Sequence, residues 1–336
     1  MRRGFVVAVL VGGLAGGALV RAGQTGVGQV PSPLPLTNTV RDRGSSVTPA
    51  FEGWYYDKDG SQRLLVGYFN RNMKQEFDIP VGPNNHIDPG GPDMGQPTHF
   101  QAGRQWGILS IKVPKDFGDK KLTWTIVSNG FTNSITLHTK ADYVVEPFED
   151  AANKNTPPKI QFTEGGPIFT GPPTTDAATY TASVGQPLAL TTWVTDEGPK
   201  INVPEPTPGR GRGRATAAGR GGDQAAGRGG RGRGDAAAAA AAAGLPEGFT
   251  PPPPIAVKWA VYRQPVGATV KFEPPNPKVD VANKGKTDTK ATFSMPGEYI
   301  LRVQGNDNTG EGGGGFECCW SNAFVKVTVT GSATSK

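Results

Sequence analysis

Residues 291–303 read ATFSMPGEYILRV, and this stretch decides the fold of the second half of the chain. Pro296 and Gly297 separate two runs of β-branched and aromatic residues, and such a pair is typical of a tight corner between strands. After the corner, apolar residues recur at every second position, which predicts a strand with one face in a core. The residues expected on that face are Tyr299, Leu301 and Val303, with Ile300 and Arg302 on the other face.

Strand-like runs of alternating apolar and β-branched residues recur through the rest of this half. They are Tyr180–Val194, Ala256–Tyr262, Ala268–Phe272 and Phe324–Thr330. A VGQP turn divides the first run, and Trp259 lies within the second, where it can fill a core between two sheets. Together with residues 289–303, these runs predict an all-β domain over residues 176–331.

The order of these runs resembles a PKD-type or related bacterial immunoglobulin-like domain. In that family a VGQP turn precedes strand B, a tryptophan lies on strand C and the pattern A-T-F-x-x-P-G-x-Y-x-L-x-V covers strands E and F. The closing strand ends in V-x-V-T, which matches residues 327–330. The resemblance implies structural roles for Trp259, Pro296, Gly297 and Tyr299, the last in a tyrosine corner. No cysteine lies at the positions on strands B and F, and nothing in the motif is catalytic.

The first half of the chain predicts another all-β domain, a sandwich over residues 49–150. Two pairs of aromatic or β-branched runs flank turn sequences, Asp57-Lys58-Asp59-Gly60 and Asn129-Gly130, as in β-hairpins. No window shows a helical period. The expected strands lie in Phe51–Tyr56, Arg63–Asn70, residues 105–114, the two halves of residues 121–138, and Tyr143–Glu146.

The segments outside the two domains have their own signatures. Residues 1–22 begin with Arg2 and Arg3 and continue with an apolar run over Phe5–Val20, which is the layout of a secretory signal peptide. Residues 23–48 read as a flexible lead-in and residues 151–175 as a linker. Export predicts a periplasmic, cell-surface or extracellular location, with no integral membrane domain after signal cleavage.

An Arg-Gly-Ala insertion of low complexity interrupts the second domain at residues 197–254. It lacks apolar side chains to bury, so we expect disorder. Its central part, residues 209–244, holds seven arginines and two aspartates, a net charge of +5 against +6 for the whole chain, so the folded parts are close to neutral. The insertion is interpreted as a solvated spacer, or alternatively as a grip on an anionic polymer. Export argues against intracellular nucleic acid. The arginines are Arg210, Arg212, Arg214, Arg220, Arg228, Arg231 and Arg233.

The loop at residues 82–100 is the most polar part of the first domain. Its histidines and aspartates suggest a metal site with two histidines and a carboxylate, or a sugar site with Trp54 or Trp106 as an apolar platform. The alternative is a structural loop whose polar groups satisfy their own backbone. The candidate ligand-binding residues are Asn84, His86, Asp88, Asp93 and His99.

Signals for metals and catalysis are weak elsewhere. Asp57-Lys58-Asp59-Gly60 resembles a fragment of a calcium loop, and Asp307 and Glu311 are candidate calcium ligands. No nucleophile elbow, zinc-protease motif or phosphate-binding loop occurs. No cofactor is therefore expected, and the chain is interpreted as not being an enzyme.

The chain has only two cysteines, Cys318 and Cys319, and they are adjacent. They follow a glycine run between the last two expected strands. The interpretations are a vicinal disulfide forming a rigid loop tip beside Trp320, reduced or structural thiols, and intermolecular bridges or metal binding. An end loop of this kind often carries recognition in immunoglobulin-like folds.

The sequence as a whole favours an exported, non-catalytic interaction or scaffold protein with an envelope protein or polysaccharide as its partner. The alternative functions are a carbohydrate-binding accessory protein and an unrecognised hydrolase.

Overall fold

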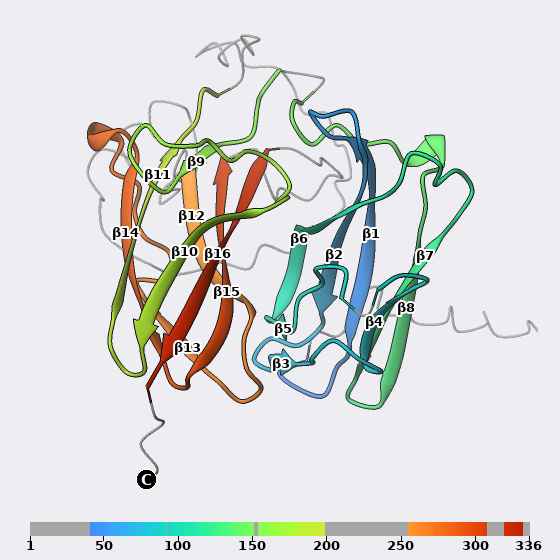
Figure 1. The fold of residues 1–336 in the computed structure, drawn as a ribbon, viewed down its shortest axis with the longest axis horizontal. Coiled ribbons are helices and arrows are strands. Elements are labelled where there is room, and N and C mark those ends of the chain that lie inside the picture. The colour runs from blue at the N-terminus through green and yellow to red at the C-terminus, as the bar shows by residue number, and fades with distance from the viewer. Residues whose placement is uncertain (1–40, 92, 151–153, 199–254, 308–318, 332–336) are drawn as a thin grey trace, which may run out of the picture. The chain divides into compact units, whose positions relative to one another are not determined.

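A computed structural model describes residues 41–91, 93–150, 154–198, 255–307 and 319–331. They belong to one compact unit, Val40–Lys336. Strands β1–β8 form the first sandwich and strands β9–β16 form the second (Figure 1). Apart from two short 3-10 helices, these residues hold no helix. The predicted all-β fold with two β-sandwiches is confirmed.

The first sandwich consists of two antiparallel sheets, in the orders β1-β2-β6 and β4-β7-β8, and a small ribbon of β3 and β5. Both predicted hairpins are present, and Asn129 and Gly130 have the expected positive φ of 49° and 78°. The strands are β1 (Val47–Tyr56), β2 (Gln62–Asn70), β3 (Phe77–Asp78), β4 (Asn85–Asp88), β5 (His99–Phe100), β6 (Gly103–Lys112), β7 (Leu122–Ser128) and β8 (Phe131–Leu137).

The second sandwich has sheets in the orders β10-β16-β15-β12 and β13-β14-β11-β9. Strand β10 runs parallel to β16, whereas the other pairs are antiparallel, and this order is that of an immunoglobulin-like sandwich. The strands are β9 (Lys159–Gln161), β10 (Asp176–Ser183), β11 (Leu188–Thr195), β12 (Ile255–Arg263), β13 (Val270–Glu273), β14 (Lys286–Phe293), β15 (Gly297–Asp307) and β16 (Trp320–Thr330).

The corner that the sequence predicts in the second sandwich is present. The Tyr299 hydroxyl donates a hydrogen bond of 2.7 Å to the carbonyl of Met295, across Pro296 and Gly297. The predicted face of β15 lies in the core, as does Trp259, which is 2% exposed. The chain therefore turns between β14 and β15 because one buried phenol satisfies a backbone carbonyl at the corner.

Three predicted boundaries are wrong. The expected linker contains β9, which pairs with β11, and the expected lead-in already reaches β1 at Val47. The expected strand Tyr143–Glu146 is reduced to a single β-bridge between Val144 and Trp54, because the 3-10 helix η1 (Ala141–Tyr143) includes its first residue. A second 3-10 helix, η2 (Val281–Asn283), follows β13.

Several predictions fall outside the described residues. They are the signal peptide, nearly all of the Arg-Gly-Ala insertion, and the glycine run with Glu311 and Cys318. Among the residues that the structure describes, no helix is long and apolar enough to cross a membrane.

Candidate functional site

The two sandwiches meet along a seam that covers part of the outer face of the sheet β10-β16-β15-β12. Tyr262, Ile300 and Phe324 lie on this face and pack against the core of the first sandwich. The rings of Tyr262 and Phe324 are 4.4 Å apart between centroids. The middle of strand β15, residues 301–305, is therefore buried on both faces, which makes the sandwiches parts of one hydrophobic assembly.

Trp320 closes one end of the seam. It is 2% exposed and packs with Tyr55 and Leu65 of the first sandwich. Its ring lies against Gly107 of β6, where an added Cβ would stand 1.8 Å from the indole. The interpretation of Trp320 as part of a loop tip is therefore wrong, because its large apolar ring is needed to fill the seam. The preceding residue, Cys319, is buried and disulfide-bonded.

A buried acid lies next to this contact. The carboxylate of Glu52 accepts hydrogen bonds from Arg104 Nη2 at 2.7 Å and from the Gly107 backbone N–H at 2.6 Å. Burial raises the pKa of Glu52 to about 6, although the Arg104 cation beside it acts in the opposite direction. Across the seam, Arg302 donates to Gln105, and within its own sheet it donates to Asn322. These polar groups are paired, as buried polar groups must be.

The polar loop of residues 82–100 also joins the two sandwiches. The Arg263 guanidinium donates two hydrogen bonds of 2.7 Å to the carboxylate of Asp93. Arg263 Nε also donates to the carbonyl of Gln96 at 2.9 Å, and the Tyr262 hydroxyl donates to that of Gly95 at 2.6 Å. Arg263 also helps hold the pKa of Asp93 below its usual value. The loop is therefore a structural clamp at this point.

His99 lies at the centre of a charged cluster, here called the His99 cluster, with Asp78 and Glu76. Its Nδ1 is 2.8 Å from Asp78 and its Nε2 is 3.2 Å from Glu76. Burial alone lowers the pKa of His99, but the two carboxylates outweigh it and raise the pKa to about 9. With a carboxylate at each ring nitrogen, His99 is an imidazolium at neutral pH and has no nitrogen left to act as a general base.

Asp78 extends the cluster into the second sandwich. It accepts hydrogen bonds from Gln264 Nε2 at 2.9 Å and from the backbone N–H of Gly267 at 3.2 Å. Gln264 Nε2 also donates to the carbonyl of Ala268 at 2.8 Å. The segment after β12 is therefore tied to the ribbon of β3 and β5 by one carboxylate.

A cleft of about 550 Å³, here called the seam cleft, opens beside the His99 cluster. The first sandwich contributes Glu76, His99 and Gln101 to its lining, and the second contributes residues of β12, β13 and their connection. Phe272 stacks on Trp259 at 6.3 Å, with 29° between the planes. The oxygens Gln101 Oε1 and Gln264 Oε1 are buried and have no hydrogen-bond donor within the described residues.

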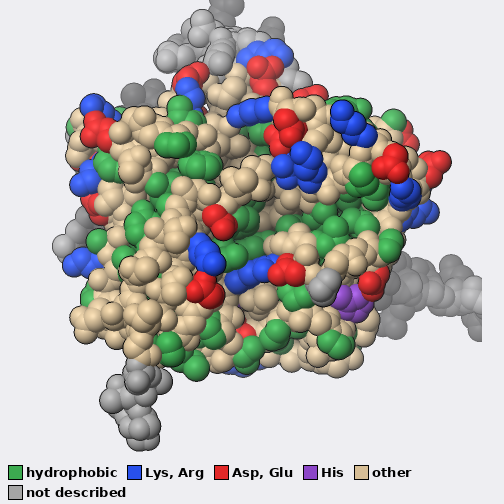
Figure 2. Space-filling model, viewed as in Figure 1, with side chains coloured by type: hydrophobic (Ala, Val, Ile, Leu, Met, Phe, Trp, Pro, Cys, Tyr) green, Lys and Arg blue, Asp and Glu red, His purple; other side chains and the backbone are tan. Residues whose placement is uncertain are grey.

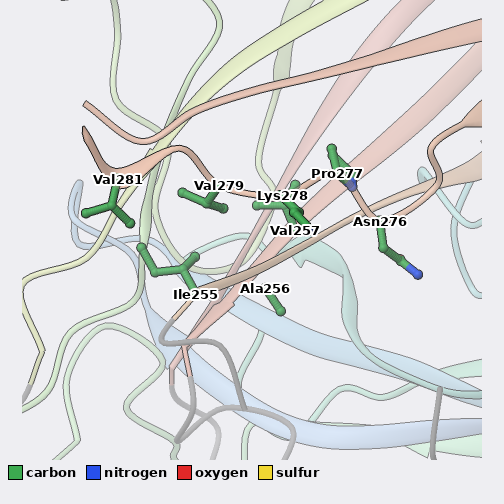
Figure 3. A pocket seen from close by; sticks show the side chains of 8 residues that line it. All are labelled: Ile255, Ala256, Val257, Asn276, Pro277, Lys278, Val279 and Val281. Atoms are coloured by element: carbon green, nitrogen blue, oxygen red, sulfur yellow. The ribbon is translucent and has the colours of Figure 1, made fainter. Parts of the chain in front are cut away.

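A second pocket, of about 360 Å³, lies between the start of β12 and residues 276–281 (Figure 3). The side chains of Ile255, Val279 and Val281 cluster in it, and Asn276 lies at the far end of the row. Few polar groups line this pocket, so it offers little to orient a ligand. The seam cleft, with its mixture of acids, amides and an aromatic ring, is the better candidate site.

The structure separates the residues of the predicted loop site. His86 Nε2 is 3.3 Å from Asp88 on β4, whereas Asp93 and His99 belong to the seam and Asn84 is exposed. In the described residues no group of three His, Cys, Asp or Glu side chains is placed to hold a metal ion. The prediction of a metal site in this loop is therefore wrong. Asp307 is buried and accepts a hydrogen bond from Asn155.

The two tryptophans expected to form a sugar platform take other roles. Trp54 is 5% exposed and donates from Nε1 to the carbonyl of Lys140 at 2.7 Å, so its ring belongs to the core. Trp106 lies under the Arg104 guanidinium, 3.8 Å from the ring centroid. The prediction of a platform at Trp54 is wrong for this reason. Gln101 and Phe272, which line the seam cleft, belong to no sequence motif. They are far apart in the sequence, and only the folded chain places them near each other.

Comparisons with known proteins assign no family to this chain. No protein-family model matches the chain, and no curated protein matches it. Domains 4 and 5 of the S-layer protein SbsC are 10% identical, with 85% of this chain and 98% of that chain covered and a TM-score of 0.20. A protein of unknown function from Porphyromonas gingivalis W83 is 9% identical, with coverages of 84% and 100% and a TM-score of 0.20.

Zebrafish RET cadherin-like domains 1 to 4 are 11% identical, with 77% of this chain and 46% of that chain covered and a TM-score of 0.19. TM-scores this low carry no argument. The immunoglobulin-like assignment of the second sandwich therefore rests on its strand pairing, and the PKD resemblance stays a prediction.

Proposed function

We propose that this chain is an exported, non-catalytic interaction or scaffold protein that acts at the cell envelope or outside the cell. The observation that carries the proposal is the seam, where apolar contacts and paired polar groups fix one sandwich against the other. A rigid pair of sandwiches holds its end loops at a constant spacing, which suits a protein that bridges partners. The second sandwich is proposed to be of the PKD type.

The charge distribution supports a neutral or mixed partner for the folded part. On the face shown in Figure 2, acidic and basic side chains lie next to one another, without a large area of one sign. The arginines of the insertion remain the proposed contact for an anionic polymer. An envelope protein or a polysaccharide is the proposed partner for the sandwiches.

Co-sedimentation with isolated cell envelopes tests this function. The full chain and a variant without residues 209–244 are each mixed with envelopes from the source cell, at low and at high salt. We expect both to sediment, with less salt dependence for the deletion variant. Release of soluble sugar or peptide from the envelopes would identify an enzyme instead, and a protein that stays in the supernatant at both salt concentrations would contradict the proposal.

A further inference from the structure

We propose that the seam cleft binds a neutral sugar residue, with its hydroxyl groups bonded to Gln101 and Glu76 and one apolar face on Phe272. This deepens the proposed function, whose partners include a polysaccharide, and rests on it. Binding to envelopes without binding to any neutral probe would contradict this inference alone. The cleft volume of about 550 Å³ falls within the usual range of small-molecule sites, roughly 300–1,000 Å³.

Acceptor oxygens in the cleft are available to a ligand. Gln101 Oε1 is buried with no donor within the described residues, so turning this amide toward a ligand hydroxyl gains a hydrogen bond and loses none at the oxygen. Glu76 is half-exposed and bonds His99 through Oε2, so Oε1 can accept from a second hydroxyl. Gln264 Oε1 is a further acceptor in the wall, held in place by the two bonds that its Nε2 donates.

The aromatic pair supplies the apolar surface that a sugar ring needs. Phe272 is partly exposed on the edge strand β13 and is stacked on Trp259, which is buried. The ring is therefore held in one orientation before any ligand arrives. A rigid aromatic face beside acceptors for hydroxyl groups matches a pyranose ring, which has an apolar face and a polar edge.

The charges around the cleft disfavour ionic ligands. The carboxylates of Glu76 and Asp78 lie on either side of His99 and would repel an anion. Lys258 and Lys271 line the same cleft and would repel a cation. Because both positive and negative side chains lie close to the cleft, a neutral ligand experiences less electrostatic repulsion there than an ion of either sign.

The test measures binding of the full chain to a panel of tetrasaccharides and to the polyamine spermidine by titration calorimetry. The neutral probes are cellotetraose, maltotetraose, xylotetraose and chitotetraose, and the charged probes are a galacturonate tetramer and spermidine. We expect at least one neutral probe to bind and the charged probes to bind at least tenfold more weakly.

Two substitutions in the cleft locate the site. We expect Gln101→Leu to weaken binding about fivefold, because one hydrogen bond is lost, and Phe272→Ala to weaken it about tenfold. The matched controls, Gln186→Leu and Phe131→Ala, change exposed residues outside the cleft and should leave binding unchanged. The proposal is overturned if no neutral probe binds, if only a charged probe binds, or if the cleft variants bind as tightly as their controls. Should Phe272→Ala fail to fold, Gln101→Leu alone decides the outcome.

Discussion

The indole of Trp320 and the backbone of Gly107 are in contact across the seam, so close that a Cβ at Gly107 would stand 1.8 Å from the ring. Gly107 also has a positive φ of 50°, a backbone conformation that residues other than glycine rarely adopt. Asn322 Nδ2, two residues after Trp320, donates to the Gly107 carbonyl at 3.3 Å. The contact therefore combines an apolar ring, a bare backbone and a hydrogen bond.

Substitution of Gly107 tests how much this contact stabilises the protein. We expect Gly107→Ala to reduce the free energy of unfolding by about 3 kcal/mol, from backbone strain and the displacement of Trp320. The measurement is urea denaturation. Gly103→Ala is the matched control, because Gly103 has a φ of 84° but nothing within 4 Å of an added Cβ. Equal losses in the two variants would show that the indole contact contributes nothing.

The His99 cluster predicts a loss of stability at high pH. Since the pKa of His99 is raised to about 9 in the folded protein, from about 6.5 in an unfolded chain, its contribution is complete below pH 6.5. It is lost as the pH rises through 9, by up to about 3 kcal/mol. Denaturation curves between pH 6 and pH 10 measure this loss. His99→Gln should flatten the profile, whereas His86→Gln should not, and a wild-type profile that is already flat would contradict the prediction.

Glu52 predicts a second change, in a lower range of pH. Burial raises the pKa of Glu52 to about 6, so the folded state favours its protonated form more than the unfolded state does. The stability linked to this group is complete below pH 4.5 and decreases as the pH rises through 6. Glu52→Gln should remove that slope, and Glu298→Gln, at an exposed site, serves as the control. A slope that is unchanged in Glu52→Gln would contradict the prediction, because another group would then cause it.

The strands can be predicted where apolar and polar residues alternate along the sequence. The contact between the two sandwiches cannot be predicted in this way. Tyr299 and Trp259 take their predicted places because their neighbours along the chain determine which face is buried. The burial of Ile300 and Arg302 on the opposite face depends instead on residues nearly 200 positions away, such as Gln105. Nothing local in ILRV distinguishes a solvent-facing side from one covered by a second sandwich.

The polar loop shows the same limit for the candidate site. Its histidines and aspartates predict a shared ligand site. In the structure, Asp93 bonds Arg263 and His99 bonds Asp78 and Glu76, so the four side chains do not face one site. Gln101 and Phe272 carry no motif, and only the approach of β13 to the β5–β6 connection places them on one cleft. A site whose residues come from distant parts of the chain shows no motif with a fixed spacing in the sequence.

The corner at Tyr299 is predicted from the sequence, and a single substitution tests its contribution to stability. Tyr299→Phe keeps the ring in the core and removes the hydroxyl that bonds the Met295 carbonyl at 2.7 Å. We expect a loss of about 1–2 kcal/mol in the free energy of unfolding, because the carbonyl then lacks its donor. Tyr180→Phe is the control, since its ring packs against the same core from an edge strand. Equal stability of the two variants, measured by urea denaturation, would mean that packing alone makes the corner.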